Sequence, residues 1–135
     1  MSKEYRKLTR AEFYDLVSHA KDDREFLLDL LQTDLFEFFS EHDMEGFLID
    51  GVPIYCGCIN SDHFTYTIMR DGVKEKYPFT LYKMVKDSTR RYADKLGDVK
   101  CKITSNCGEA NLIKRWIKQI GYEPVGDDVY ILKGN

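Results

Sequence analysis

The sequence contains no long run of apolar residues. No stretch approaches the roughly 18 consecutive apolar residues needed to span a bilayer, and the segment Met1 to Arg6 lacks the apolar centre of a secretory signal. We therefore expect a soluble protein made in a cytoplasm, without a membrane anchor. Repeats and linkers are also missing, so we expect residues 1–135 to form a single domain. A hydrophobic content of 43% excludes a disordered chain.

Metal-site patterns are missing as well. The four cysteines are Cys56, Cys58, Cys101 and Cys107, and the three histidines do not cluster beside them. A C-x-C pair with a distant C-x5-C pair is not a zinc spacing. We predict no metal site and, in a reducing cytoplasm, free thiols rather than disulfides.

The chain also has no strong excess of either charge, although its segments differ. The formal net charge of -3 argues against a nucleic-acid-binding protein. Residues 1–69 contain 6 basic and 14 acidic residues, whereas residues 70–118 contain 13 basic and 6 acidic residues. The middle of the chain is therefore cationic, and this suits an acidic partner or an anionic ligand.

The first half of the sequence predicts a strand, helices and a three-stranded meander. A short strand over 5–8 precedes a capping box at Thr9 and Glu12, which starts a helix. Apolar residues at helical spacing then predict one helix, or two short ones, over 22–42. Asp50-Gly51 between apolar runs predicts a hairpin of strands 46–49 and 52–56. Residues 64–69 read as the next strand.

The second half alternates helices and strands. Residues 70–76 read as a loop, and Pro78 and Gly97 bound a helix over 78–96. A strand over 99–104, a helix ending before Gly121 and a closing hairpin over 122–132 follow. The predicted order β-α-α-β-β-β-α-β-α-β-β indicates an α/β (α+β) domain, with one mixed central sheet and helices on both faces.

This order resembles the GCN5-related N-acetyltransferase (GNAT) superfamily. The most specific local likeness is NLIKRWIKQIGYE, residues 111–123, which is similar to the last helix of that superfamily and the Gly-aromatic pair after it. The resemblance implies acetyl-CoA as cosubstrate and transfer of an acetyl group to an amine. It places cofactor contacts at the end of the fourth strand and in the loop after it: Ile68, Arg70, Gly72, Lys74 and Lys76.

Two departures from the family pattern weaken the implied activity. The glycine-rich loop that holds the pyrophosphate by backbone N–H groups keeps one glycine here, Gly72, and Pro78 removes a donor near the helix start. The position of the usual general-acid tyrosine is Ile117, which cannot donate a proton. His63 and Glu45 are weak candidates for a base, although a surface histidine and a solvated carboxylate explain both residues as well.

A second resemblance is to the small internal virion proteins of short-tailed bacteriophages, which are degraded GNAT relatives. It implies a host-cytoplasm or virion location and a role in particle assembly or host takeover. The helix over 78–96 carries a basic face that suits a protein partner: Lys83, Lys86, Arg90 and Arg91.

Two functions therefore remain open. One is a GNAT-fold protein that has lost catalysis and acts by binding, which the two departures favour. The other is an active acyl-CoA-dependent N-acetyltransferase, in which backbone N–H groups of the strand over 64–69 polarise the thioester carbonyl.

Overall fold

The computed structural model describes residues 1–104, 107 and 109–134. Its first half holds four strands and three helices, in the order β1 (Lys3–Arg6), α1 (Arg10–Ser18), α2 (Lys21–Leu31), α3 (Leu35–Glu41), β2 (Glu45–Ile49), β3 (Val52–Ile59) and β4 (Thr65–Met69). Its second half holds α4 (Val73–Lys76), α5 (Pro78–Leu96), β5 (Val99–Lys102), α6 (Ala110–Ile120), β6 (Glu123–Gly126) and β7 (Val129–Leu132).

Helix boundaries in the first half follow from local hydrogen bonds. The Thr9 hydroxyl accepts from the Glu12 N–H at 3.2 Å, and the Glu12 carboxylate accepts from the Thr9 N–H at 2.9 Å, so the capping box is confirmed. Gln32 ends α2 in the left-handed region, and Asp34 caps α3 by accepting from the Glu37 N–H at 2.8 Å. The segment over 22–42 therefore forms two helices.

The predicted hairpin also forms. Asp50 and Gly51 have φ angles of 51° and 79°, as a two-residue turn between twisted strands requires. The register of β2 and β3 shifts between Phe47 and Leu48, where Pro53 pairs with Leu48. Pro53 thus lies at a bulge, a position that tolerates its missing N–H.

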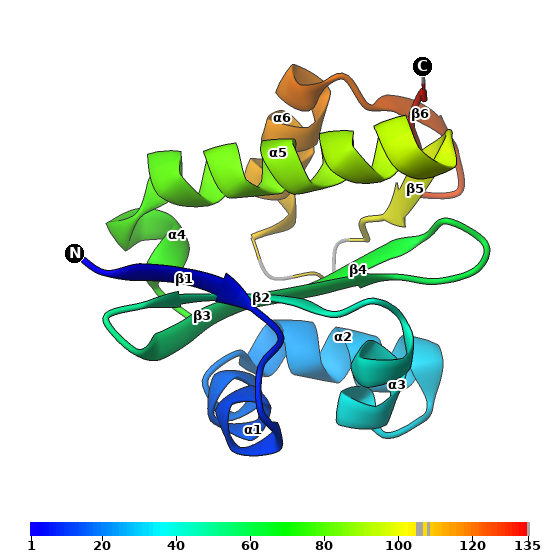
Figure 1. The fold of residues 1–135 in the computed structure, drawn as a ribbon. Helices are drawn as coiled ribbons and strands as arrows, with labels where there is room; N and C mark the ends of the chain where they lie inside the picture. The colour runs from blue at the N-terminus through cyan, green and yellow to red at the C-terminus, as the bar shows by residue number, and fades with distance from the viewer. Residues whose placement is uncertain (105–106, 108, 135) are drawn as a thin grey trace.

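The strands form two sheets that meet at one point. The first sheet is antiparallel with the order β1-β2-β3-β4, and the second is antiparallel with the order β5-β7-β6. A single parallel bridge between Phe64 and Lys100 connects them, and the Lys100 N–H donates to the His63 carbonyl at 2.8 Å. The predicted α+β architecture is confirmed, and its mixed sheet is divided into two parts (Figure 1).

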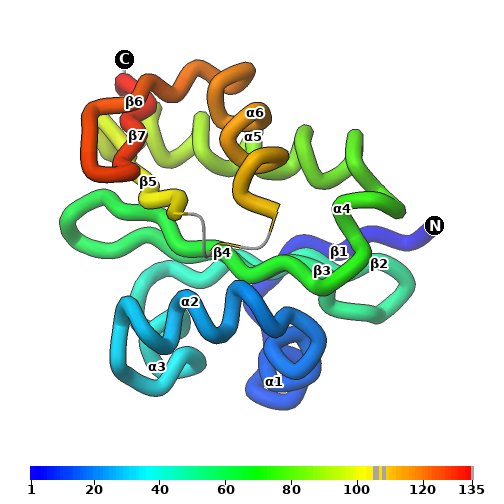
Figure 2. The backbone as a smooth tube through the Cα atoms, turned by 180° about the vertical axis from the view of Figure 1, so that it is seen from behind, coloured from blue at the N-terminus to red at the C-terminus, as the bar shows by residue number. Residues whose placement is uncertain are grey.

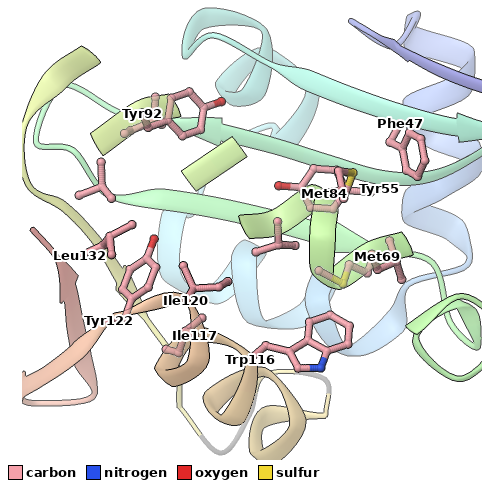
Figure 3. Packing of buried hydrophobic residues seen from close by; sticks show 14 of the residues in the cluster. Phe47, Tyr55, Met69, Met84, Tyr92, Trp116, Ile117, Ile120, Tyr122 and Leu132 are labelled. Carbon is pink, nitrogen blue, oxygen red and sulfur yellow. The ribbon is translucent and has the colours of Figure 1, made fainter. Parts of the chain in front are cut away.

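Helices cover both faces of the first sheet (Figures 1 and 2). Helices α1, α2 and α3 lie on one face, where a core cluster contains Phe13, Phe39 and Cys56. Helices α5 and α6 lie on the other, where a second cluster contains Tyr55 and Trp116 (Figure 3). The small sheet packs with α5 and α6 in this second cluster.

One part of the sequence prediction is wrong. Residues 70–76 are not a plain loop, because Val73–Lys76 form the single turn α4 directly before α5. Gly72 precedes this turn with a φ of 84°, a conformation that glycine adopts without strain. Two of the residues that the resemblance assigns to cofactor binding, Lys74 and Lys76, therefore lie in a helical turn rather than in an open loop.

Candidate functional site

Strands β4 and β5 separate immediately after their single bridge. The Arg70 N–H donates to the Ile54 carbonyl at 3.0 Å, so even-numbered residues of β4 direct their backbone groups toward β3. The odd-numbered residues Thr65, Thr67 and Met69 therefore direct theirs toward the opposite edge. Only the start of that edge is covered by β5, where the Thr65 hydroxyl donates to the Lys100 carbonyl at 3.3 Å.

A cavity of about 110 Å³ fills the space where the strands diverge. It is comparable in size to the ~150 Å³ cavities in which proteins bind small aromatic molecules. Helix α2 borders it on one side of the sheet, and α5 and α6 border it on the other. Its wall includes Asp23, Phe26, Tyr55, Thr65, Tyr66, Thr67, Met69, Lys74, Ser88, Thr89, Tyr92, Cys101, Lys102, Cys107, Trp116, Ile117 and Tyr122.

Hydroxyl groups make up most of the neutral polar part of this wall. Tyr122 lies beside Ile117, Ile120 and Leu132 (Figure 3). Its pKa is raised, chiefly by burial, while nearby Thr65 and Thr89 partly offset the rise. Burial is also the main cause of the raised pKa of Tyr92, with a contribution from Glu45. Both hydroxyls therefore keep their protons at neutral pH.

The open edge of β4 carries one unusual contact. The Met69 N–H donates to the Asp23 carboxylate of α2 at 3.0 Å, across 46 residues of sequence. Among the described residues that line the cavity, Asp23 is the only carboxylate. The acid therefore lies at the position that a ligand along this edge would take.

The predicted cofactor residues are dispersed around the loop after β4. Arg70 donates to the Asp15 carboxylate at 2.9 Å, and Lys76 lies over the Tyr77 ring at 5.3 Å. Lys74 lines the cavity and its ammonium is 3.3 Å from the Glu109 carboxylate. Gly72 is exposed at the surface. Two of the three cations are therefore already paired with acids.

Lys74 has the most confined charge of the group. Only 7% of its side chain is exposed, whereas 39% of the Glu109 side chain is exposed, so the ion pair between them is buried on the lysine side only. Burial raises the pKa of Glu109, and a hydrogen bond with Glu75 raises it further. The same hydrogen bond lowers the pKa of Glu75. Three ionisable groups, Lys74, Glu75 and Glu109, therefore interact beside α4, and Lys74 is the one that lines the cavity.

Two of the positions singled out in the sequence, Ile68 and Ile117, differ in their relation to the cavity. Ile68 is fully buried in the core cluster beneath α1–α3, and it is absent from the cavity wall, whereas its neighbours Thr67 and Met69 line it. Ile117 does line the cavity, with 5% of the residue exposed. The family's general-acid position thus faces the cavity with an aliphatic side chain.

His63 and Glu45 lie outside the cavity wall. His63 has a φ of 66°, and its ring nitrogen Nδ1 lies 3.1 Å from the Asp98 carbonyl at the junction of the two sheets. Glu45 accepts from the Ser88 hydroxyl at 2.7 Å and from Arg91 at 3.1 Å. Glu45 and Arg91 line an outer groove against α5, which shares Tyr55 and Ser88 with the cavity.

The four cysteines are free thiols. Burial raises the pKa of Cys101 to about 12, and it also raises the pKa of Cys107. Cys56 and Cys58 are buried, with pKa values raised by burial. A protonated thiol is a weak nucleophile, so the cysteines on the cavity wall are poor acyl acceptors.

Within the described chain, no three His, Cys, Asp or Glu side chains gather closely enough to hold a metal ion. The described helices include none with the length and hydropathy to cross a bilayer.

Sequence reasoning missed much of the wall. Along β4, every second residue directs its backbone groups toward β3 and the others direct theirs toward the open edge. This period of two could have indicated the edge residues Thr65, Thr67 and Met69 once β3 was known to be the partner strand. Asp23 and Tyr122 carry no such signal, because only the tertiary structure brings them to β4.

Sequence comparison gives no relative for this chain. No protein-family model matches it, and no curated protein matches it in sequence.

Solved structures do match, and the three described below are acetyltransferases by name. A probable acetyltransferase from Staphylococcus epidermidis ATCC 12228 has a TM-score of 0.65 and 11% identity, covering 99% of this chain and 100% of its own. The PaiA N-acetyltransferase from Thermoplasma acidophilum, solved in complex with coenzyme A, has a TM-score of 0.58 and 12% identity, covering 100% and 99%. A GNAT-family acetyltransferase from Staphylococcus aureus Mu50 has a TM-score of 0.59 and 6% identity, covering 99% and 100%. At such low identity the likeness establishes the fold alone.

Proposed function

We propose that this chain, which has the GNAT fold, is an acyl-CoA-dependent N-acetyltransferase that transfers an acetyl group to an amine. The observation that carries this proposal is the cavity at the divergence of β4 and β5, with the open edge of β4 along its wall. Bound acetyl-CoA would supply the acetyl group as a thioester. The neighbour solved with coenzyme A supports the choice of ligand.

The residues present fit such a ligand in part. The Thr67 N–H, on the open edge, is placed to donate to a carbonyl oxygen and so to stabilise negative charge that develops there. Lys74 and Lys102 supply positive charge on the wall, and Lys76 lies nearby after the glycine at 72. Arg70 is a weaker candidate because it is paired with Asp15.

The residues of the cavity wall also suggest which side chain protonates the leaving thiolate. Ile117 cannot protonate a leaving thiolate, so a tyrosine hydroxyl elsewhere on the wall must do so. Tyr122 lines the cavity, and its hydroxyl carries a proton at neutral pH. We assign this role to Tyr122 rather than to His63 or Glu45, which lie outside the wall.

A thermal-shift titration with acetyl-CoA tests the proposal. At 100 times its Kd a ligand adds about 2.7 kcal/mol of stability, which corresponds to about 10 °C for 135 residues. Thr67→Trp would fill the cavity from an exposed position and abolish the shift, whereas Val125→Trp on the outer strand β6 would keep it. No shift at millimolar acetyl-CoA in the wild-type protein would refute binding.

A second candidate is a non-catalytic protein that acts by binding. Two observations favour it: the cations Arg70 and Lys74 are paired with acids, and position 117 carries isoleucine. Its partner would contact the basic face of α5, where Lys83 and Lys86 are exposed. Acetyl-CoA binding without release of CoA in the presence of a panel of primary amines would support this alternative. A pull-down on wild-type protein and on Lys83→Glu/Lys86→Glu protein would identify the partner.

A further inference from the structure

The contact between Asp23 and Met69 joins a carboxylate to the edge of a strand. Asp23 lies in the first turn of α2, and its Oδ2 atom accepts from the Met69 N–H at 3.0 Å. A hydrogen bond to a charged acceptor is stronger than one between neutral groups. The contact is therefore among the stronger polar interactions of the cavity wall.

The direction of the Met69 N–H makes the contact relevant to a ligand. Because Arg70 donates to β3, the N–H of Met69 lies on the opposite edge, two residues after that of Thr67. Both residues line the cavity. A ligand chain that follows this edge with a carbonyl oxygen would meet the Met69 N–H there.

Asp23 also interacts with a second residue of the cavity wall, Cys107. Burial is the main cause of the raised pKa of Cys107, and the charge of Asp23 adds to the rise. Both residues are on the cavity wall, from α2 and from the connection between β5 and α6. The Asp23 carboxylate thus acts on Cys107 as well as on the edge of β4.

We propose that Asp23 occupies, in the free protein, the hydrogen-bonding position of a ligand carbonyl, and so determines how tightly the cavity binds acyl-CoA. This inference rests on the proposed function. One N–H cannot donate fully to two acceptors, so the thioester or amide carbonyl of the ligand must displace the carboxylate. Loss of a hydrogen bond to a charged group corresponds to an affinity lower by about tenfold.

Calorimetric titration with acetyl-CoA tests this on four proteins. Asp23→Ala removes the acceptor and is expected to bind about tenfold more tightly than the wild type. Asp23→Asn keeps an acceptor oxygen without the charge, so its hydrogen bond to the Met69 N–H is weaker and its affinity is expected to lie between those of the wild type and of Asp23→Ala. Asp22→Ala is the matched control, because Asp22 carries the same charge one residue earlier but is exposed and off the cavity wall.

The outcomes separate the possible explanations. Equal affinities of the Asp23→Ala and wild-type proteins overturn the inference and leave the proposed function intact. Equal tightening by Asp23→Ala and Asp23→Asn also overturns it, because relief of charge repulsion with the phosphates would then be sufficient. Absence of binding by all four proteins removes the proposed function itself. If Asp23→Ala does not fold, Asp23→Ser replaces it, since its hydroxyl is too short to reach Met69 in the same way.

Discussion

Replacing Tyr92 with phenylalanine should stabilise the protein. The residue is 7% exposed, and within the described chain its hydroxyl has no hydrogen-bond partner. The neighbouring Ser88 hydroxyl partly offsets the rise in the Tyr92 pKa, but it lies outside hydrogen-bond geometry with the Tyr92 hydroxyl and donates its own proton to Glu45 at 2.7 Å. An unsatisfied buried hydroxyl costs about 1–3 kcal/mol, and an apolar replacement of the same shape removes that cost.

The expected gain can be converted to a melting temperature. A chain of 135 residues has an unfolding entropy of about 0.28 kcal/mol/K near its midpoint. A gain of about 1 kcal/mol therefore raises the Tm by about 3–4 °C. Thermal denaturation followed by circular dichroism measures this shift directly.

Tyr82→Phe is the matched control for this experiment. Tyr82 lies on the same helix and packs against Trp116, with ring centroids 6.0 Å apart, but it is only partly buried. Its hydroxyl is not among the unsatisfied buried atoms, so its removal should leave the Tm within about 1 °C. A fall in Tm for Tyr92→Phe would refute the reasoning, because it would mean that the hydroxyl has a stabilising partner.

Three further changes have defined outcomes. Gly46→Ala would place a Cβ atom 2.6 Å from the Arg6 carbonyl oxygen and should lower stability by about 1–3 kcal/mol; an unchanged Tm would contradict this. Arg6 and the Thr9 N–H lower the pKa of Glu12 to about 2 from 4.5. Glu12→Gln should therefore reduce the urea midpoint at pH 7, with a deficit that shrinks as pH falls from 4.5 toward about 2; a deficit independent of pH would exclude the carboxylate. Cys101, whose pKa is about 12, should stay unmodified by iodoacetamide at pH 8 in the folded protein and react after unfolding, as mass spectrometry would show.

Local signals in the sequence predicted the elements well. The capping box at Thr9, the Asp50-Gly51 turn and the limits of α5 at Pro78 and Leu96 all depend on neighbouring residues, and the structure has each of them. The order of elements indicated the GNAT fold for the same reason, since it needs only their succession. The turn α4 was missed because a single helical turn has too few residues for a periodic pattern.

The site was less accessible to sequence reasoning because its contacts are long-range. The positive charges of Arg70 and Lys74 suggested phosphate binding, yet each is paired with an acid far away in sequence, Asp15 and Glu109. The basic stretch of α5 is likewise partly neutralised, as Arg91 pairs with Glu45. Charge counts along a chain do not reveal such pairs, which depend on how the helices pack against the sheet.

The single bridge between Phe64 and Lys100 has a mechanical consequence. Because one backbone pair connects the two sheets among the residues that the structure describes, no ladder of hydrogen bonds between those residues fixes the angle of one sheet to the other. The spacing of β4 and β5 beyond the bridge is set instead by side chains of α5 and α6, such as Val85 and Trp116. We therefore expect that a rotation of one sheet relative to the other would change the width of the cavity more readily than it would disturb either sheet.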